Sequence, residues 1–125
     1  MPEIVMPTKI IGIIGSRKRD TRKDFRLVES AFIFMYSPGD IIVSGLCPTG
    51  GDRFAIMLVE KYKVDYVWFP ADWNHFGQGA GKYRNTFVAY AVEHLIATPH
   101  RTTGGTDDTI TKFVKRNGRA NLILL

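Results

Sequence analysis

The chain has 125 residues, a size typical of one domain built around a single hydrophobic core. Hydrophobic residues make up 45% and charged residues 23% of it, as in ordinary globular proteins, and no apolar run approaches the roughly 20 residues that a membrane helix needs. The one cysteine excludes an internal disulfide, and the first residues lack a signal-peptide pattern, so we expect a single cytoplasmic domain over residues 1–125.

Short apolar runs alternate with stretches of helical spacing along the chain. The run at 9–14 is continuous and β-branched, as in a strand buried on both faces, and Phe25, Val28, Phe32 and Met35 then recur at helical spacing. The same reasoning predicts, in chain order, a strand at 9–14, a helix at 20–36, a strand at 41–43, a helix from near 52 to 62, a strand at 66–69, a helix at 80–93, a strand at 94–97, a helix at 106–117 and a strand at 121–125.

This alternation predicts the fold class. Apolar strands separated by helices indicate a Rossmann-like three-layer α/β/α domain with a mainly parallel five-stranded sheet. Residues 71–82, which carry three glycines, are expected to be mainly loop. Asp52 stands near the start of its helix, where a carboxylate suits the exposed amides and the helix dipole.

The unusual residues follow the strands, so they are expected at one edge of the sheet, where open parallel sheets bind ligands. Glycines there let backbone amides approach an anion, and a helix that starts directly afterwards adds its own amides. An ordinary turn with capping threonines is the alternative for 102–106. The loops predicted to meet at this edge contain Gly15, Ser16 and Arg17, then Ser44, Gly45, Gly50, Gly51 and Asp52, then 73–85, and finally 102–108.

Positive charge is concentrated between Arg17 and Arg26, in a chain of net charge +5. Two interpretations stay open for this run, a solvated loop and helix face or a patch that steers phosphate or nucleic acid.

Several common site types are not predicted. The glycines after the first strand do not form G-x-G-x-x-G, and no G-x-x-x-x-G-K-[ST] occurs, so neither a standard dinucleotide site nor a P-loop is expected. His75, His94 and His100 lack ligand-like spacing with one another or with Cys47, so we expect no metal. No cofactor is expected.

Taken together, the motifs resemble the YspA-like family of the SLOG superfamily, over about residues 8–125. This superfamily includes DprA/Smf and the LOG phosphoribohydrolases, and the resemblance implies a Rossmann-like domain that binds nucleotides or nucleotide-derived ligands. The motifs that carry it are Gly15-Ser16-Arg17, Ser44-Gly45 with Gly50-Gly51-Asp52, Ala71-Asp72-Trp73, Gly81-Lys82-Tyr83-Arg84-Asn85 and Gly104-Gly105-Thr106.

The glycine-threonine turn is similar to the end of the LOG turn P-G-G-x-G-T, which grips the ligand phosphate. The resemblance implies that Gly104, Gly105 and Thr106 hold phosphate here. Thr102 and Thr103 replace the leading glycines, and we expect Thr103 to add a hydroxyl donor.

The remaining roles are also implied by the resemblance. Arg84 would contact phosphate or ribose, and Asn85 a ribose hydroxyl or a base. The LOG pattern places a catalytic glutamate where this chain has Thr109, and the nearest carboxylates are Asp107 and Asp108. If the chain hydrolyses an N-glycosidic bond, Arg84 and Asp108 are therefore the catalytic candidates, with Asp107 counted among the ligand-binding residues.

Three functions follow as hypotheses: a binding or sensing domain for a nucleotide-derived ligand, a LOG-like phosphoribohydrolase, and a DprA-like single-strand nucleic-acid binder. Trp73 is expected to stack on a base. A homodimer is expected, with Phe32, Phe34 and Met35 supplying apolar helix surface.

Overall fold

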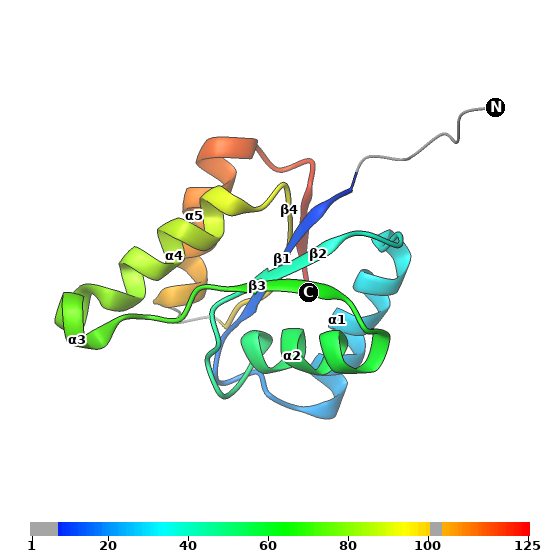
Figure 1. Cartoon of the computed structure of the whole chain (residues 1–125), viewed down its shortest axis with the longest axis horizontal. Coiled ribbons are helices and arrows are strands. Elements are labelled where there is room, and N and C mark those ends of the chain that lie inside the picture. Colours follow the sequence, from blue (N-terminus) through cyan, green and yellow to red (C-terminus); the bar gives the residue numbers. More distant parts are fainter. Residues whose placement is uncertain (1–7, 101–103) are drawn as a thin grey trace.

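A computed structural model describes residues 8–100 and 104–125, which form a five-stranded sheet with helices on both faces (Figure 1). All four strand pairs in this part of the chain are parallel, and the predicted Rossmann-like three-layer fold is confirmed. The strands are β1 (Ile10–Gly15), β2 (Ile41–Ser44), β3 (Asp65–Trp68), β4 (His94–Thr98) and β5 (Leu122–Leu124). The helices are α1 (Arg22–Met35), α2 (Gly51–Tyr62), α3 (Trp73–Phe76), α4 (Ala80–Ala91) and α5 (Gly105–Asn117), with a 3-10 turn, η1 (Gly77–Gly79), before α4.

Two apolar clusters hold the three layers together, one on each face of the sheet. Ile11 and Ile13 of β1 face α1 and α2, whereas Ile14, on the opposite side of the same strand, faces α4 and α5. Phe32 is the largest buried side chain that α1 contributes, and Phe113 plays this part for α5. Burial on both faces explains why the central strands are continuously apolar rather than alternating.

The strand order places the site. It runs β3-β2-β1-β4-β5, so the chain builds outward from β1 in one direction and then returns to the other side of β1 with β4. The loops that leave β1 and β4 therefore turn to opposite faces, and a crevice opens between them beyond the carboxyl ends of these strands. β1 and β4 run downward in Figure 1, so the carboxyl ends of these two strands lie in the lower part of the view.

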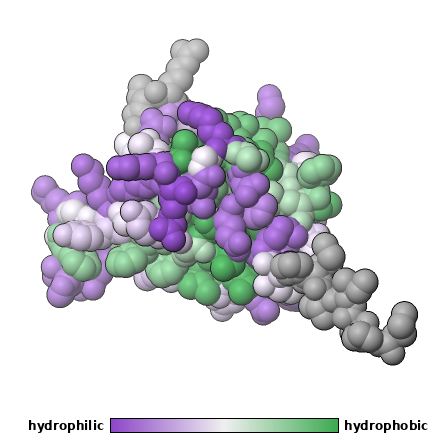
Figure 2. Space-filling model, turned by 90° about the horizontal axis from the view of Figure 1, so that it is seen from above, coloured by the Kyte–Doolittle hydropathy of each residue, from purple (hydrophilic) through white to green (hydrophobic). Residues whose placement is uncertain are grey.

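Strand β3 is an exposed edge rather than a buried strand. Tyr66 and Val67 are exposed, because the helices cover β1, β2 and β4 and leave the outermost strand bare. Tyr66 stacks on Trp68, with ring centroids 4.7 Å apart. Figure 2 looks down from above Figure 1 and shows patches of hydrophobic residues among hydrophilic ones, at the upper right, the right and the lower edge of this face.

The prediction that 71–82 is mainly loop is wrong. This stretch forms α3 and η1 and the first turn of α4. The Asp72 side chain accepts a hydrogen bond from the His75 amide at 3.0 Å and so caps α3. Gly77 ends that helix with φ at +58°, a conformation that favours glycine. Helical spacing cannot reveal a helix of four residues, since it covers little more than one turn.

Helix α1 begins with a capping box that the sequence analysis did not use. The Thr21 hydroxyl accepts a hydrogen bond from the Asp24 amide, and the Asp24 carboxylate accepts one from the Thr21 amide. On the same helix, Phe34 is 90% exposed, but Phe32 belongs to the core and cannot supply apolar surface for a dimer. Dimerisation through this helix stays a prediction that rests on Phe34 and its neighbours.

Candidate functional site

A cleft of about 780 Å³ lies at the carboxyl ends of β1 and β4, where the strand order predicts a ligand site. Its walls come from the loop after β1, the loop after β2, helices α3 and α4, and the first turn of α5. Thirteen of the residues that sequence reasoning assigned to the site line this cleft: Gly15, Ser16, Arg17, Gly45, Asp52, Trp73, Arg84, Asn85, Gly104, Gly105, Thr106, Asp107 and Asp108.

Three predicted residues lie behind the wall instead of on it. Ser44, Gly50 and Gly51 do not line the cleft. Thr103, also predicted, falls outside the described residues. Lys18, Gln78, Lys82 and His100 also line the cleft, although sequence reasoning assigned them no individual role. Lys82 and Gln78 belong to the predicted loop 73–85, and Lys18 directly follows the Gly15-Ser16-Arg17 motif, so their place along the chain is the signal that points to them.

Gly51 brings the start of α2 against the end of β1. A Cβ atom added to Gly51 would lie 2.1 Å from the Gly15 nitrogen and 2.1 Å from the Ile14 carbonyl carbon, and one added to Gly50 would lie 2.4 Å from the Ser16 oxygen. The Gly50 amide donates to Asp20 at 2.7 Å. This glycine pair therefore serves backbone packing, and its first amide already has an acceptor from the protein.

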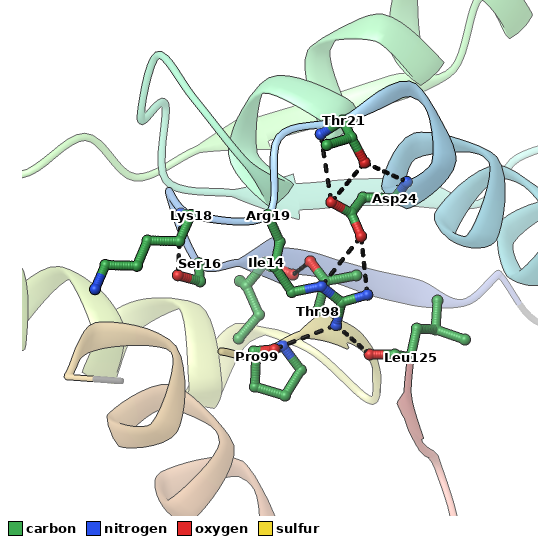
Figure 3. Close-up of polar contacts among 9 residues, drawn as sticks. All are labelled: Ile14, Ser16, Lys18, Arg19, Thr21, Asp24, Thr98, Pro99 and Leu125. Atoms are coloured by element: carbon green, nitrogen blue, oxygen red, sulfur yellow. Dashed lines mark hydrogen bonds and ion pairs between the residues drawn. The ribbon is translucent and has the colours of Figure 1, made fainter. Parts of the chain in front are cut away.

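Arg19 connects the loop after β1 to the start of α1 and to the residues that follow β4 and β5 (Figure 3). Its guanidinium donates to the Asp24 carboxylate at 3.0 and 3.1 Å, to the Pro99 carbonyl at 3.2 Å and to the main-chain oxygen of Leu125. In Figure 3 the Lys18 side chain extends the other way, toward the side on which α5 begins. Arg19 is thus a structural residue, and it does not add to a free basic patch.

Asp52 is a buried carboxylate in the floor of the cleft. One oxygen accepts the Ser44 hydroxyl at 2.8 Å, the other accepts the Cys47 amide at 2.9 Å and lies 3.7 Å from Nη1 of Arg84. Asp52 lies in the first turn of α2, as predicted, but its side chain does not cap the helix, because its oxygens accept from Ser44 at the end of β2 and from the Cys47 amide in the following loop. Burial raises the pKa of Asp52 above its usual value, and the hydrogen bonds and the nearby Arg84 charge only partly oppose this.

A pH-dependent effect on stability follows for Asp52→Asn. Because the folded-state pKa is raised, the folded protein holds this proton more tightly than the unfolded chain does, and the resulting stabilisation is lost as pH rises through the folded pKa. The unfolding free energy of the variant, relative to the native protein, should therefore increase from acidic to neutral pH. Urea unfolding at several pH values measures it, with Asp65→Asn on the exposed strand β3 as the control. A difference independent of pH contradicts the prediction.

Arg84 and Asn85 form a connected pair at the centre of the cleft. Nε of Arg84 donates to the Asn85 side-chain oxygen at 3.0 Å, and Nη1 donates to the Gly45 carbonyl at 2.8 Å. The Asn85 nitrogen donates to the Gly105 carbonyl at 3.1 Å and to the Asp108 carboxylate at 3.2 Å. Nη2 of Arg84 has no hydrogen-bond partner among the described residues and is the donor left for a ligand.

The first turn of α5 forms the opposite wall. A Cβ atom on Gly104 would meet nothing within 4 Å, and one on Gly105 would meet only the Asn85 nitrogen, at 3.7 Å. The protein around these glycines therefore does not require them, unlike Gly51. Asp108 accepts from Lys112 at 2.8 Å as well as from Asn85, and both contacts reach the same oxygen, Oδ2. Buried Thr109 donates its hydroxyl to the Gly105 carbonyl at 3.1 Å.

Trp73 supplies an aromatic surface at the other end of the cleft. It opens α3, and its side chain is 55% exposed even though the residue lines the cleft. A Cβ atom on Gly81 would lie 3.6 Å from the ring, so α4 supports one edge of the indole. An exposed indole face beside cationic groups suits the flat π-system of a nucleobase.

The part of the chain that the structure describes contains neither a metal-binding cluster nor a membrane span. Within residues 8–100 and 104–125, no group of three or more histidine, cysteine or acidic side chains could hold a metal ion. Across the same ranges, no helix has the length and apolar character needed to span a bilayer. Comparisons of the chain with protein-family models, curated proteins and solved structures find no match.

Proposed function

We propose that the cleft binds a nucleotide or a nucleotide-derived ligand through a phosphate group, as a binding or sensing domain. The observation that carries the proposal is that the first turn of α5 lines the same cleft as Arg84, at the switch point of a parallel sheet, and that Nη2 of Arg84 has no partner among the described residues. The first amides of a helix have no partner within the helix and attract anions. Arg84 adds a charged donor of fixed geometry.

The charges in the cleft favour a small anion held by a few side chains over an extended polyanion. Four cationic side chains line it, namely Arg17, Lys18, Lys82 and Arg84, against three carboxylates. The negative charge of two of these carboxylates is reduced. Asp108 pairs with Lys112, and Asp52 has a raised pKa and lies beside Arg84. The near balance favours a small phosphate ligand over the broad positive field that binds a nucleic-acid backbone.

The size and composition of the cleft support a ligand with more than a phosphate. Its volume of about 780 Å³ falls within the range typical of small-molecule sites. Trp73 offers a stacking surface, and Gln78 offers an amide that can bond a base or ribose. These features agree with the proposal, made from the sequence motifs, that the chain is a YspA-like member of the SLOG superfamily.

A thermal-shift screen over nucleotides, ADP-ribose and oligonucleotides tests this proposal. A ligand that binds only the folded state raises the melting temperature with its concentration. We expect nucleotides to stabilise the protein and matching nucleosides without phosphate to stabilise it less. An effect confined to oligonucleotides that falls steeply with salt supports strand binding instead. No shift with any compound contradicts the proposal.

Trp73→Ala separates base recognition from phosphate recognition. Stacking of a base on an aromatic side chain contributes on the order of 1–3 kcal/mol, so a nucleoside monophosphate should bind roughly tenfold or more weakly to this variant. Its affinity for inorganic phosphate should stay the same, because the phosphate contacts lie on α4 and α5. Isothermal titration calorimetry with both ligands measures the two effects. Equal losses for both ligands contradict a stacking role.

Asp52 favours one second candidate, hydrolysis of the N-glycosidic bond of a nucleoside monophosphate. Such cleavage passes through an oxocarbenium-like state that a positioned carboxylate stabilises. Asp108 is the alternative carboxylate, because Lys112 and Asn85 both bind its Oδ2, whereas both oxygens of Asp52 already accept hydrogen bonds. Chromatography of nucleotide incubations tests the candidate. Free base and ribose 5-phosphate should appear with the native protein, and loss of this release in Asp52→Asn or in Asp108→Asn identifies the carboxylate that acts.

A further inference from the structure

Asn85 lies in the cleft, yet its side chain is committed to the protein. Its residue is only 6% exposed, and the amide makes three hydrogen bonds to protein groups. Nε of Arg84 can only donate, so the Asn85 oxygen must face it and the nitrogen must face α5. Both amide hydrogens are then taken up, by the Gly105 carbonyl and the Asp108 carboxylate.

These contacts join the two groups that make the cleft attractive to phosphate. Arg84 belongs to α4, and Gly105 begins α5, twenty residues further along the chain. The remaining Arg84 contacts, to the Gly45 carbonyl at 2.8 Å and to the Asp52 carboxylate at 3.7 Å, both reach Nη1 and so fix one end of the guanidinium only. Without the Asn85 oxygen the guanidinium can rotate about that end, and Nη2, which has no partner among the described residues, loses a fixed direction.

We propose that Asn85 is a positioning residue that fixes the Arg84 guanidinium and the first turn of α5 relative to each other, and does not itself contact the ligand. The consequence for binding rests on the proposed phosphate-binding function. The positioning itself is a property of the ligand-free protein. Affinity should accordingly fall on substitution of Asn85, with the whole loss transmitted through Arg84 and α5.

Two substitutions separate the two contacts. Asn85→Asp keeps an oxygen acceptor for Arg84 but removes both donors to α5, and places a second carboxylate beside Asp108. Asn85→Ala removes both contacts. Asn121→Ala is the control, because Asn121 is exposed between α5 and β5 and does not line the cleft.

NMR on the ligand-free protein reads out the positioning directly. The Arg84 Nε–H signal should be protected from exchange in the native protein and in Asn85→Asp, and lost in Asn85→Ala. The Asp108 amide, which bonds the Gly104 carbonyl at 3.1 Å, should exchange roughly tenfold faster in both variants. Unchanged exchange at both positions overturns the proposal. If the added charge unfolds Asn85→Asp, Asn85→Ala carries both readouts.

Calorimetry with a nucleoside monophosphate then tests how the loss is transmitted. Both variants should bind on the order of tenfold more weakly, the effect of losing a charge-assisted hydrogen bond. In an Arg84→Ala background the further loss from Asn85→Ala should shrink to less than its effect alone. If the affinity losses of the two single variants multiply fully in the double variant, Asn85 contacts the ligand independently of Arg84, and the proposal is overturned. If the native protein binds no nucleotide, the proposed function fails, while the NMR readout still decides the role of Asn85.

Discussion

Gly51→Ala should destabilise the fold strongly. The new Cβ would lie 2.1 Å from both the Gly15 nitrogen and the Ile14 carbonyl carbon, and these are backbone atoms of the central strand that cannot turn aside. Alanine is otherwise the better helix former by about 1 kcal/mol, so without the clash the change would stabilise α2. We expect a loss of about 3 kcal/mol in unfolding free energy, measured by urea denaturation.

Gly104→Ala is the matched control for this change. Gly104 lies directly before α5, one position earlier than Gly51 lies in α2, but a Cβ atom there would meet nothing within 4 Å and φ is −97°, which any residue can adopt. Its unfolding free energy should stay within about 1 kcal/mol of the native value. Equal effects of the two substitutions contradict the account of tight packing between β1 and α2.

Arg84→Ala should have the largest effect on binding. Hydrogen bonds to charged groups contribute about 1.5–3 kcal/mol, so a nucleoside monophosphate should bind roughly 10–100 times more weakly. The substitution also leaves Asp52 without the nearby cation that helps to keep its carboxyl ionised, so the pKa of Asp52 should rise further. Calorimetry measures the affinity, and carboxyl carbon NMR follows Asp52.

Two other variants sharpen the Arg84 experiment. Arg84→Lys keeps the charge but cannot donate to Gly45 and Asn85 together, and it should recover only part of the affinity. Arg119→Ala removes a charge of the same sign from an exposed position between α5 and β5 and should leave the affinity unchanged. A similar loss in Arg119→Ala would indicate a general charge effect and contradict a specific Arg84 contact.

Sequence patterns predicted most of the fold, because strands buried on both faces are continuous apolar runs that can be recognised in the sequence. The apolar runs of β1, β2 and β4 lie within two residues of their predicted positions. Helix α4 was predicted for a reason that the structure corrects. Tyr83, Phe87 and Ala91 recur every four residues and so indicate a helix, yet Tyr83 and Phe87 are both 53% exposed. The buried face of α4 is formed instead by Ala80, Asn85, Val88 and Ala89. Any face of a helix shows the same period, so spacing alone cannot tell which one is buried.

The candidate site was predicted less completely than the fold. The expected convergence of loops at one sheet edge held for thirteen residues, since topology fixes where the ends of parallel strands meet. The roles of Gly51, Arg19 and Asn85 could not be predicted. Each role depends on a contact with a residue 20 or more positions away, and such contacts form only in the folded chain. Local patterns suggest that a glycine is needed but not whether a ligand or a neighbouring strand needs it.

An NMR titration with a nucleoside 5′-monophosphate, and with the same nucleoside lacking phosphate, tests the central claim most directly. The monophosphate should shift the amide signals of Gly105 and Thr106 and the Arg84 side-chain signal, with saturation at lower concentration than for the nucleoside. Shifts at these positions that require the phosphate agree with a phosphate-binding cleft between α4 and α5. Absence of shifts there, or equal affinity for the two compounds, contradicts it.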